Sequence, residues 1–161
     1  MSESRVQWAV DTSGPATVVK VGGEIDESAV FVRDHGLRGR VTVDLHGVTR
    51  LNSCGVRHWL DFIGSLAGVE ELVLRRCAVP FVTQLNTVVG MRGGARVESI
   101  MAPFACQECG AESVREVVLT GETIEDPESA VAGGRCAACG GVVEFDDLPE
   151  RYFAFLLRSG A

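Results

Sequence analysis

The sequence predicts an α/β protein in two parts. Residues 1–104 form a mixed β-sheet with helices mainly on one face, and residues 105–161 form a small β segment with a closing helix. Three observations favour this fold. Short alternating segments predict strands in the first part, apolar residues recur at spacings of three and four between Val56 and Ala67, and Cys-x-x-Cys-Gly motifs begin at Cys106 and Cys136.

The elements of the first part are expected in the order β-β-α-β-α-β-α-β. Asp26 is a good N-cap for a short helix through Val32, Asn52 or Ser53 caps the second helix, and Pro80 fits the start of the third. Right-handed crossovers between these elements would place the helices mainly on one face of the sheet. The strands are expected at residues 6–10, 16–21, 40–45, 69–77 and 96–100.

Two cysteine turns dominate the second part. Each Cys-x-x-Cys-Gly motif places two thiolates on one side of a tight bend, and its glycine adopts the backbone angles that the bend needs. The four cysteines predict a tetrahedral thiolate site, which zinc fits better than iron; they are Cys106, Cys109, Cys136 and Cys139. Because four protein ligands leave no position for a substrate water, one structural Zn²⁺ is expected. The alternative is redox dithiols or unrelated core cysteines.

The remainder of the second part is expected to be a zinc ribbon and a helix. Residues 114–120 and 142–145 read as ribbon strands, and the acidic stretch 121–134 reads as a mobile loop. Pro149 begins a closing helix over residues 150–158 that carries five large apolar side chains. A ribbon has little core, so this helix packs either on the rest of the chain or on a partner or second copy.

Composition and charge narrow the classes of function. With 46% hydrophobic and 23% charged residues and no apolar run near ~20 residues, the chain is expected to be folded, free of membrane spans and cytoplasmic, where cysteines stay reduced. Residues 1–104 contain 11 basic and 11 acidic residues, and residues 105–161 contain 4 and 11, so the net charge of −7 lies in the cysteine-bearing part. Nucleic-acid binding is therefore not expected.

Three short motifs carry a family resemblance. Gly23-Glu24-Ile25-Asp26 follows a strand, Val43-Asp44-Leu45 lies in the next strand, and Asn52-Ser53-Cys54-Gly55 opens a helix. In this order the segment 5–104 resembles the STAS domain, a family that includes bacterial anti-sigma-factor antagonists and has similar G-E-I/L-D, D-L and D-S-S/T-G segments. The resemblance implies a non-catalytic protein–protein interaction module in bacterial signalling, and the zinc ribbon lies outside it.

The resemblance also implies a phosphorylation site. A serine kinase modifies the first hydroxyl of the family's D-S-S/T-G segment, which here is Ser53. It implies partner docking at Asn52, Ser53, Cys54 and Gly55, with a serine kinase or an anti-sigma-type protein as the partner. A phosphate at a helix N-terminus is favoured, and its charge of about −1.5 to −2 would expel a docked protein. Asn52 and Cys54 depart from the family pattern, and a purely structural helix cap is the alternative.

An enzyme is not expected. Cys54 at a helix start and His58 one turn later are the elements of a cysteine nucleophile, but His58 lies toward the polar side of the helix. His35 and His46 are better explained as loop or strand-end residues. A thiol-based redox or zinc sensor, a ligand-binding STAS module and a homodimer held by the ribbon remain open alternatives.

Overall fold

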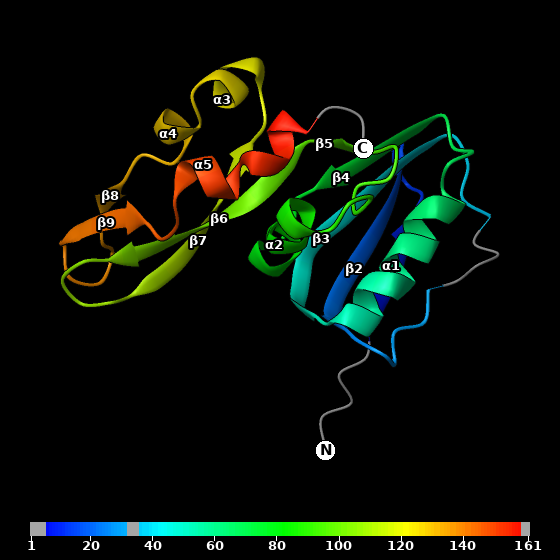
Figure 1. Ribbon diagram of the computed structural model, residues 1–161, viewed down its shortest axis with the longest axis horizontal. Coiled ribbons are helices and arrows are strands. Elements are labelled where there is room, and N and C mark those ends of the chain that lie inside the picture. The colour runs from blue at the N-terminus through cyan, green and yellow to red at the C-terminus, as the bar shows by residue number, and fades with distance from the viewer. Residues whose placement is uncertain (1–5, 32–35, 159–161) are drawn as a thin grey trace.

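The computed structural model describes residues 6–31 and 36–158, and within them the protein is mixed α/β with two β-sheets and five α-helices (Figure 1). The first sheet has the order β1-β2-β3-β4-β5 and the second the order β7-β6-β9-β8. The first sheet contains β1 (Gln7–Asp11), β2 (Thr17–Ile25), β3 (Arg40–Leu51), β4 (Glu71–Arg75) and β5 (Arg96–Val97). The second contains β6 (Ser99–Cys106), β7 (Glu112–Val118), β8 (Gly134–Arg135) and β9 (Val142–Phe145).

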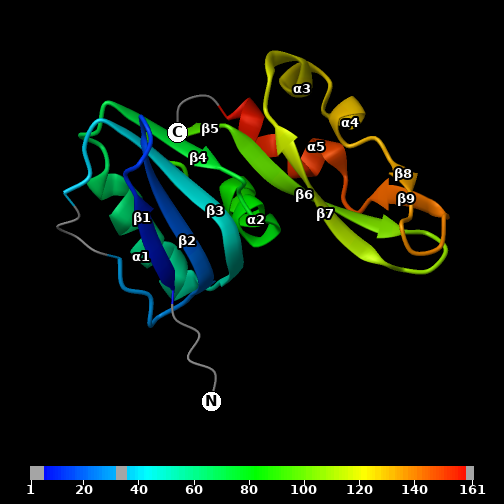
Figure 2. The ribbon, with the colours of Figure 1, turned by 180° about the vertical axis from the view of Figure 1, so that it is seen from behind.

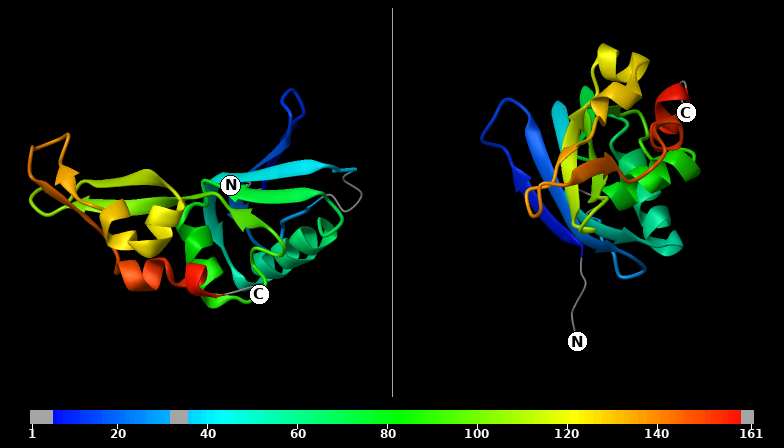
Figure 3. Two further views of the ribbon diagram at one scale, coloured as in Figure 1. Left: turned by 90° about the horizontal axis from the view of Figure 1, so that it is seen from above. Right: turned by 90° about the vertical axis from the view of Figure 1, so that its left-hand side faces the viewer.

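The connections place two helices on one face of the first sheet. β1 and β2 form an antiparallel hairpin, and β2 to β5 run parallel. Parallel neighbours need crossover segments, which are α1 (Ser53–Ser65) between β3 and β4 and α2 (Val79–Thr87) between β4 and β5. Both helices lie on the same side of the sheet (Figure 3). The prediction of a mixed sheet within an α/β protein is confirmed.

The core lies between this sheet and its helices. Alternate residues of β2 and β3 point inward, including Val19, Val43 and Leu45, none of which is exposed to solvent. The helices contribute Trp59 and Phe81, whose rings meet edge to face with centroids 5.0 Å apart. The Trp59 indole also donates to the Met91 carbonyl at 2.7 Å, which satisfies its buried polar atom.

Close packing fixes the start of α1. Asn52 is the N-cap, and its side-chain oxygen accepts from the Gly55 amide at 2.8 Å. Gly55 itself lies against the end of β2, where an added Cβ would come within 1.7 Å of the Ile25 carbonyl oxygen. The expected cap and helix are confirmed, and glycine is required because the helix approaches the strand backbone.

The chain passes from one sheet to the other without a linker. β5 ends at Val97, and after Glu98 the chain enters β6 of the second sheet. Cys77 pairs with Ile100 in a parallel bridge, so the chain after β4 stays attached to β6. The prediction of one strand over residues 96–100 is therefore wrong: the segment belongs to two sheets.

A buried polar network joins the sheets on the face opposite the helices. Asp44 of β3 is 2% exposed and pairs with Arg75 and Arg76, which follow one another at the end of β4. The Arg76 amide donates to the Ser99 hydroxyl at 2.8 Å, and that hydroxyl donates to Glu116 of β7 at 2.8 Å. The network thus runs from the first sheet through β6 to the edge strand of the second.

On the helix side, the C-terminal segment packs against α2. The expected helix over 150–158 is instead α5 (Pro149–Tyr152) followed by a 3-10 turn, η1 (Ala154–Leu157). The Asn86 amide on α2 donates to the Tyr152 carbonyl at 2.9 Å and accepts from the Phe155 amide at 2.8 Å. The apolar residues of this segment pack on the rest of the chain, which was one of the two expected outcomes.

Two further expectations are wrong. The described part of the expected Asp26–Val32 helix is a turn at 26–28 followed by irregular chain, while Val32 and His35 lie outside the described residues. Asp26 uses its side chain to accept from the Ser28 amide at 2.8 Å, which is turn chemistry rather than helix capping. The stretch 121–134 is not an irregular loop, because α3 (Gly121–Glu125) and α4 (Pro127–Ala130) form there and are capped by Thr120 and Asp126.

Two glycines of α1 should respond oppositely to alanine. Gly55→Ala forces a Cβ into the Ile25 backbone, and we expect it to lower the free energy of unfolding by about 3 kcal/mol or more. Gly64→Ala meets nothing within 4 Å and should raise the free energy of unfolding by ~0.5–1 kcal/mol. Urea unfolding of both variants measures this, and equal effects would contradict the close approach of α1 to β2.

Asp44 should make stability depend on pH. Burial alone would raise its pKa, but hydrogen bonds from Arg76 and the His46 amide and the arginine charges lower the pKa below the ordinary 3.8. Its contribution to stability is therefore present above pH 3.8 and is lost as the pH falls through the lower pKa of the folded state. At pH 7 we expect Asp44→Asn to be about 2 kcal/mol less stable than the parent, and urea unfolding should show this difference shrinking in acid. A difference that stays constant down to pH 2.5 would contradict the paired state.

Candidate functional site

Two matching turns build the cysteine cluster. In the first, the Cys106 amide donates to the Ala111 carbonyl at 2.9 Å and the Gly110 amide donates to the Cys106 carbonyl at 3.0 Å. The second repeats this pattern, with Cys136 bonded to Gly141 at 2.8 Å and Gly140 bonded to Cys136 at 2.9 Å. Both glycines after the second cysteine have positive φ, 75° and 74°, which a residue with a side chain rarely adopts.

The turns bring four thiols to one point. The Sγ atoms of Cys106, Cys109, Cys136 and Cys139 all lie within 4.8 Å of one another. Across the two turns, Cys106 and Cys139 are 3.5 Å apart and Cys109 and Cys136 are 3.7 Å apart. This spacing matches four ligands around one tetrahedral ion. The cluster can bind a metal ion such as zinc.

Backbone amides also surround the sulfur atoms. The Cys109 amide donates to the Cys106 sulfur at 3.5 Å, and the Ala138 and Gly141 amides donate to the sulfurs of Cys136 and Cys139 at 3.4 Å. Such donors favour thiolates, the form that binds metal. Hydrogen bonds from the Cys109 and Glu108 amides lower the pKa of Cys106 to about 6. The Ala111 amide acts in the same direction on Cys109, but contacts with three other thiols raise the pKa of that residue to about 12.

The strands of the second sheet position the cluster at its far end. Cys106 is the last residue of β6, and Cys136 follows β8 directly. These two thiols are buried, whereas Cys109 and Cys139 at the turn tips are exposed. In Figure 1, β8 and β9 lie at the end of the molecule remote from α1. A metal ion there would tie β6, β8 and β9 together, where only two and three residue pairs join β9 to its neighbours.

The second group of predicted residues lies at the start of α1. Ser53 and Cys54 are exposed in the first turn, and Gly55 is buried against β2. Asn52 uses both ends of its amide, because its nitrogen donates to Glu27 at 2.8 Å while its oxygen caps the helix. The Glu27 carboxylate therefore lies within hydrogen-bonding distance of the residue that caps α1.

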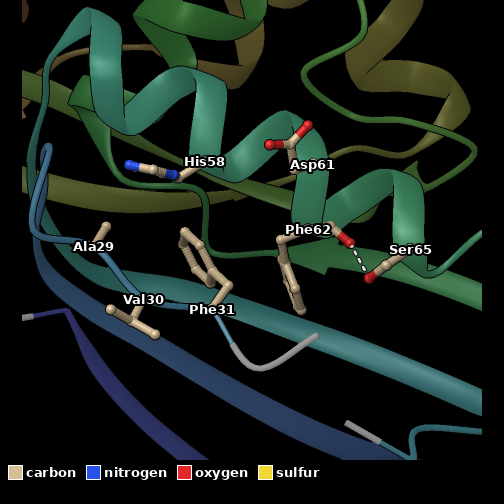
Figure 4. Close-up of a pocket in the computed structure, with 7 residues that line it drawn as sticks. All are labelled: Ala29, Val30, Phe31, His58, Asp61, Phe62 and Ser65. Carbon is tan, nitrogen blue, oxygen red and sulfur yellow. Dashed lines mark hydrogen bonds between the residues drawn. The ribbon is translucent and has the colours of Figure 1, made fainter. Parts of the chain in front are cut away.

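A cavity of about 510 Å³ borders the other side of α1 (Figure 4). His58, Asp61 and Ser65 line it from the helix, and Ala29 to Phe31 line it from the segment after β2. Figure 4 shows His58 and Asp61 on separate turns, and the Ser65 hydroxyl donates to the Phe62 carbonyl at 2.6 Å. The cavity supports no catalytic assignment.

A scan against protein-family models, a search of curated proteins and a search of solved structures each found no match. In the described part of the chain no helix has both the length and the apolar character needed to cross a bilayer.

The sequence interpretation missed the polar network around Asp44. A charged residue among the alternating apolar positions Val41, Val43 and Leu45 was one available signal, since a buried carboxylate needs cationic partners. The adjacent Arg75 and Arg76 at the end of the next strand were the other. His46, expected at a strand end, lies instead within β3.

Zinc content should depend on the exposed cysteines of the cluster. We expect about one zinc ion per chain in the parent and almost none in Cys109→Ser or Cys139→Ser, because three thiolates and a hydroxyl bind zinc much more weakly. Cys54→Ser is the control, as Cys54 is also exposed but lies outside the cluster. Native mass spectrometry and a zinc-release assay measure the content, and a parent without zinc after expression in zinc-supplemented medium would contradict the prediction.

Proposed function

We propose that the protein is a non-catalytic protein–protein interaction module, with one structural zinc ion in a C-terminal ribbon and a docking surface at the start of α1. The observation that supports this proposal most directly is the four-thiol cluster. Four cysteine ligands occupy every position of a tetrahedral ion, so the ion would hold strands together and would not activate water. When bound, zinc supplies four strong bonds to this small sheet, whose own core is limited.

The start of α1 supports the docking surface. Ser53 and Cys54 present exposed side chains on a helix of 13 residues whose first turn is held by Asn52 and by the close contact at Gly55. A rigid, exposed helix end is suited to partner recognition, and a phosphate on Ser53 would reverse that recognition. By its resemblance to STAS anti-sigma-factor antagonists, the partner is a serine kinase or an anti-sigma-type protein in the bacterial cytoplasm.

A thiol-based redox sensor is the second candidate. The observation favouring it is that thiols from the two turns lie 3.5 and 3.7 Å apart, so loss of the metal would leave pairs ready to form disulfides. Peroxide oxidises such a pair by taking two electrons, and the thiol protons leave as water forms. A count of free thiols before and after peroxide, with zinc release followed in parallel, separates this function from a purely structural site.

Partner capture tests the docking surface. Parent, Ser53→Asp and Ser65→Asp proteins are immobilised and exposed to native cell extract, and bound proteins are quantified by mass spectrometry. Ser65 is exposed at the opposite end of the same helix, so it controls for added charge. We expect Ser53→Asp alone to lose a kinase or anti-sigma-type protein by roughly tenfold or more. If all three baits retain the same proteins, Ser53 is only part of a helix start.

A further inference from the structure

A hollow of about 310 Å³ lies on the face of the first sheet that no helix covers. Figure 2 views both sheets from this side, with α1 behind them, and Figure 3 shows the β1–β2 hairpin rising from the same face. Residues of the β1–β2 hairpin line the hollow together with residues of β3 and with Arg76. Neither the cysteine cluster nor the start of α1 contributes to it.

The floor of the hollow is bare backbone. Gly22 of β2 and Gly47 of β3 are register partners. A Cβ on Gly22 would lie 3.3 Å from the Gly47 Cα, and a Cβ on Gly47 would lie 3.2 Å from the Gly22 Cα. The group that approaches each glycine is the backbone of the other strand, so a side chain at either position would crowd the β2–β3 pair. Neither position places a side chain in the hollow.

A β-bulge in β3 determines which of its side chains face the hollow. Lys20 pairs with Asp44 and Gly22 pairs with Gly47, so β3 has one more residue than β2 over this interval. Such a bulge redirects side chains and often lies beside binding sites. Here it leaves Leu45 buried in the core and His46 exposed at the hollow.

Arg76 occupies a strained backbone conformation at the edge of the hollow. Its φ is 47°, the only positive value at a non-glycine position among the described residues. The amide is held by Ser99 at 2.8 Å, and the guanidinium is held by Asp44, with Nε 3.1 Å from Oδ2. Functional sites often contain a residue whose strained backbone conformation is maintained by contacts to its amide and its side chain.

The charges that line the hollow are mainly positive. Lys20 and Arg76 line it together with Asp44, the one acidic residue of the lining, and Arg75 pairs with Asp44 from outside the lining. Asp44 already accepts from both arginines and from the His46 amide at 3.1 Å. Asp11 on the neighbouring strand interacts with Lys20, and Glu116 interacts with Arg76, but neither lines the hollow. The lining itself therefore holds two cationic side chains and one carboxylate, a net charge of +1.

From these features we propose that the hollow binds a small anion bearing phosphate or carboxylate groups, with Lys20 and Arg76 as its cationic contacts and the glycine floor against its body. The volume is at the lower end of the range for small-molecule sites. A flat backbone floor accommodates a ligand that a side chain would exclude. This site is independent of the interaction function proposed above.

Calorimetric titration with pyrophosphate and with citrate, in separate arms at constant sodium chloride, tests the site and distinguishes phosphate from carboxylate recognition. We expect saturable binding of at least one anion by the parent. Lys20→Ala should weaken it roughly tenfold or more, because a charge-assisted contact is lost. Arg57→Ala is the matched control, since Arg57 is exposed on α1 and its loss changes the net charge equally.

A second measurement uses the fact that Lys20 is the only lysine of the chain. Reductive methylation with ¹³C-formaldehyde labels Lys20 and the terminal amine while keeping their charge. The Lys20 resonance should shift saturably with the bound anion. The proposal is overturned if neither anion binds the parent, if Arg57→Ala weakens binding as much as Lys20→Ala, or if the Lys20 resonance does not move.

Discussion

The attachment of the second sheet to the first depends on the segment from Arg76 to Ile100. Cys77 bridges Ile100, the Arg76 amide binds Ser99, and Asp44 holds the Arg76 side chain. Buried polar groups stabilise a fold only when their partners are present, because an unpaired charge or amide in this region costs far more than the bond returns. The strained φ of Arg76 is maintained because Ser99 binds its amide and Asp44 binds its side chain.

On the helix side, aromatic contacts and hydrogen bonds form a second connection between the two parts of the protein. Phe145 of β9 contacts Phe104 of β6 and Tyr152 of α5, with ring centroids 5.8 and 5.4 Å away, and the Tyr152 hydroxyl donates to the Met101 carbonyl. Asn86 then fastens the same segment to α2. The C-terminal segment thus packs the cysteine-bearing part against α2. A metal ion at the cysteine cluster would act on the distal end of this arrangement, where packing is sparse.

Features carried by local chemistry could be predicted from the sequence. The periodic apolar residues of α1, the Asn52 cap and the repeated Cys-x-x-Cys-Gly motif each act within a few residues, and the structure confirms the helix and the clustering of the thiols. The expected helix after Asp26 failed because an aspartate that caps a helix can equally close a turn. The split of residues 96–100 between two sheets could not be predicted, since it depends on Cys77 and on β7, which are distant in sequence.

The distribution of charge, too, could be predicted only in part from the sequence. The net charge of −7 and the acidic second part argue against a nucleic-acid surface, because that argument concerns long-range repulsion over many phosphates. A site for one small anion depends instead on the few charges within contact distance. Folding brings Lys20 from β2 and Arg76 from the end of β4 to one hollow. The hollow has a single buried carboxylate, that of Asp44, which Arg75 and Arg76 already neutralise. Topology, not composition, sets the sign of the local field, so an acidic chain can present a cationic site on an uncovered sheet face.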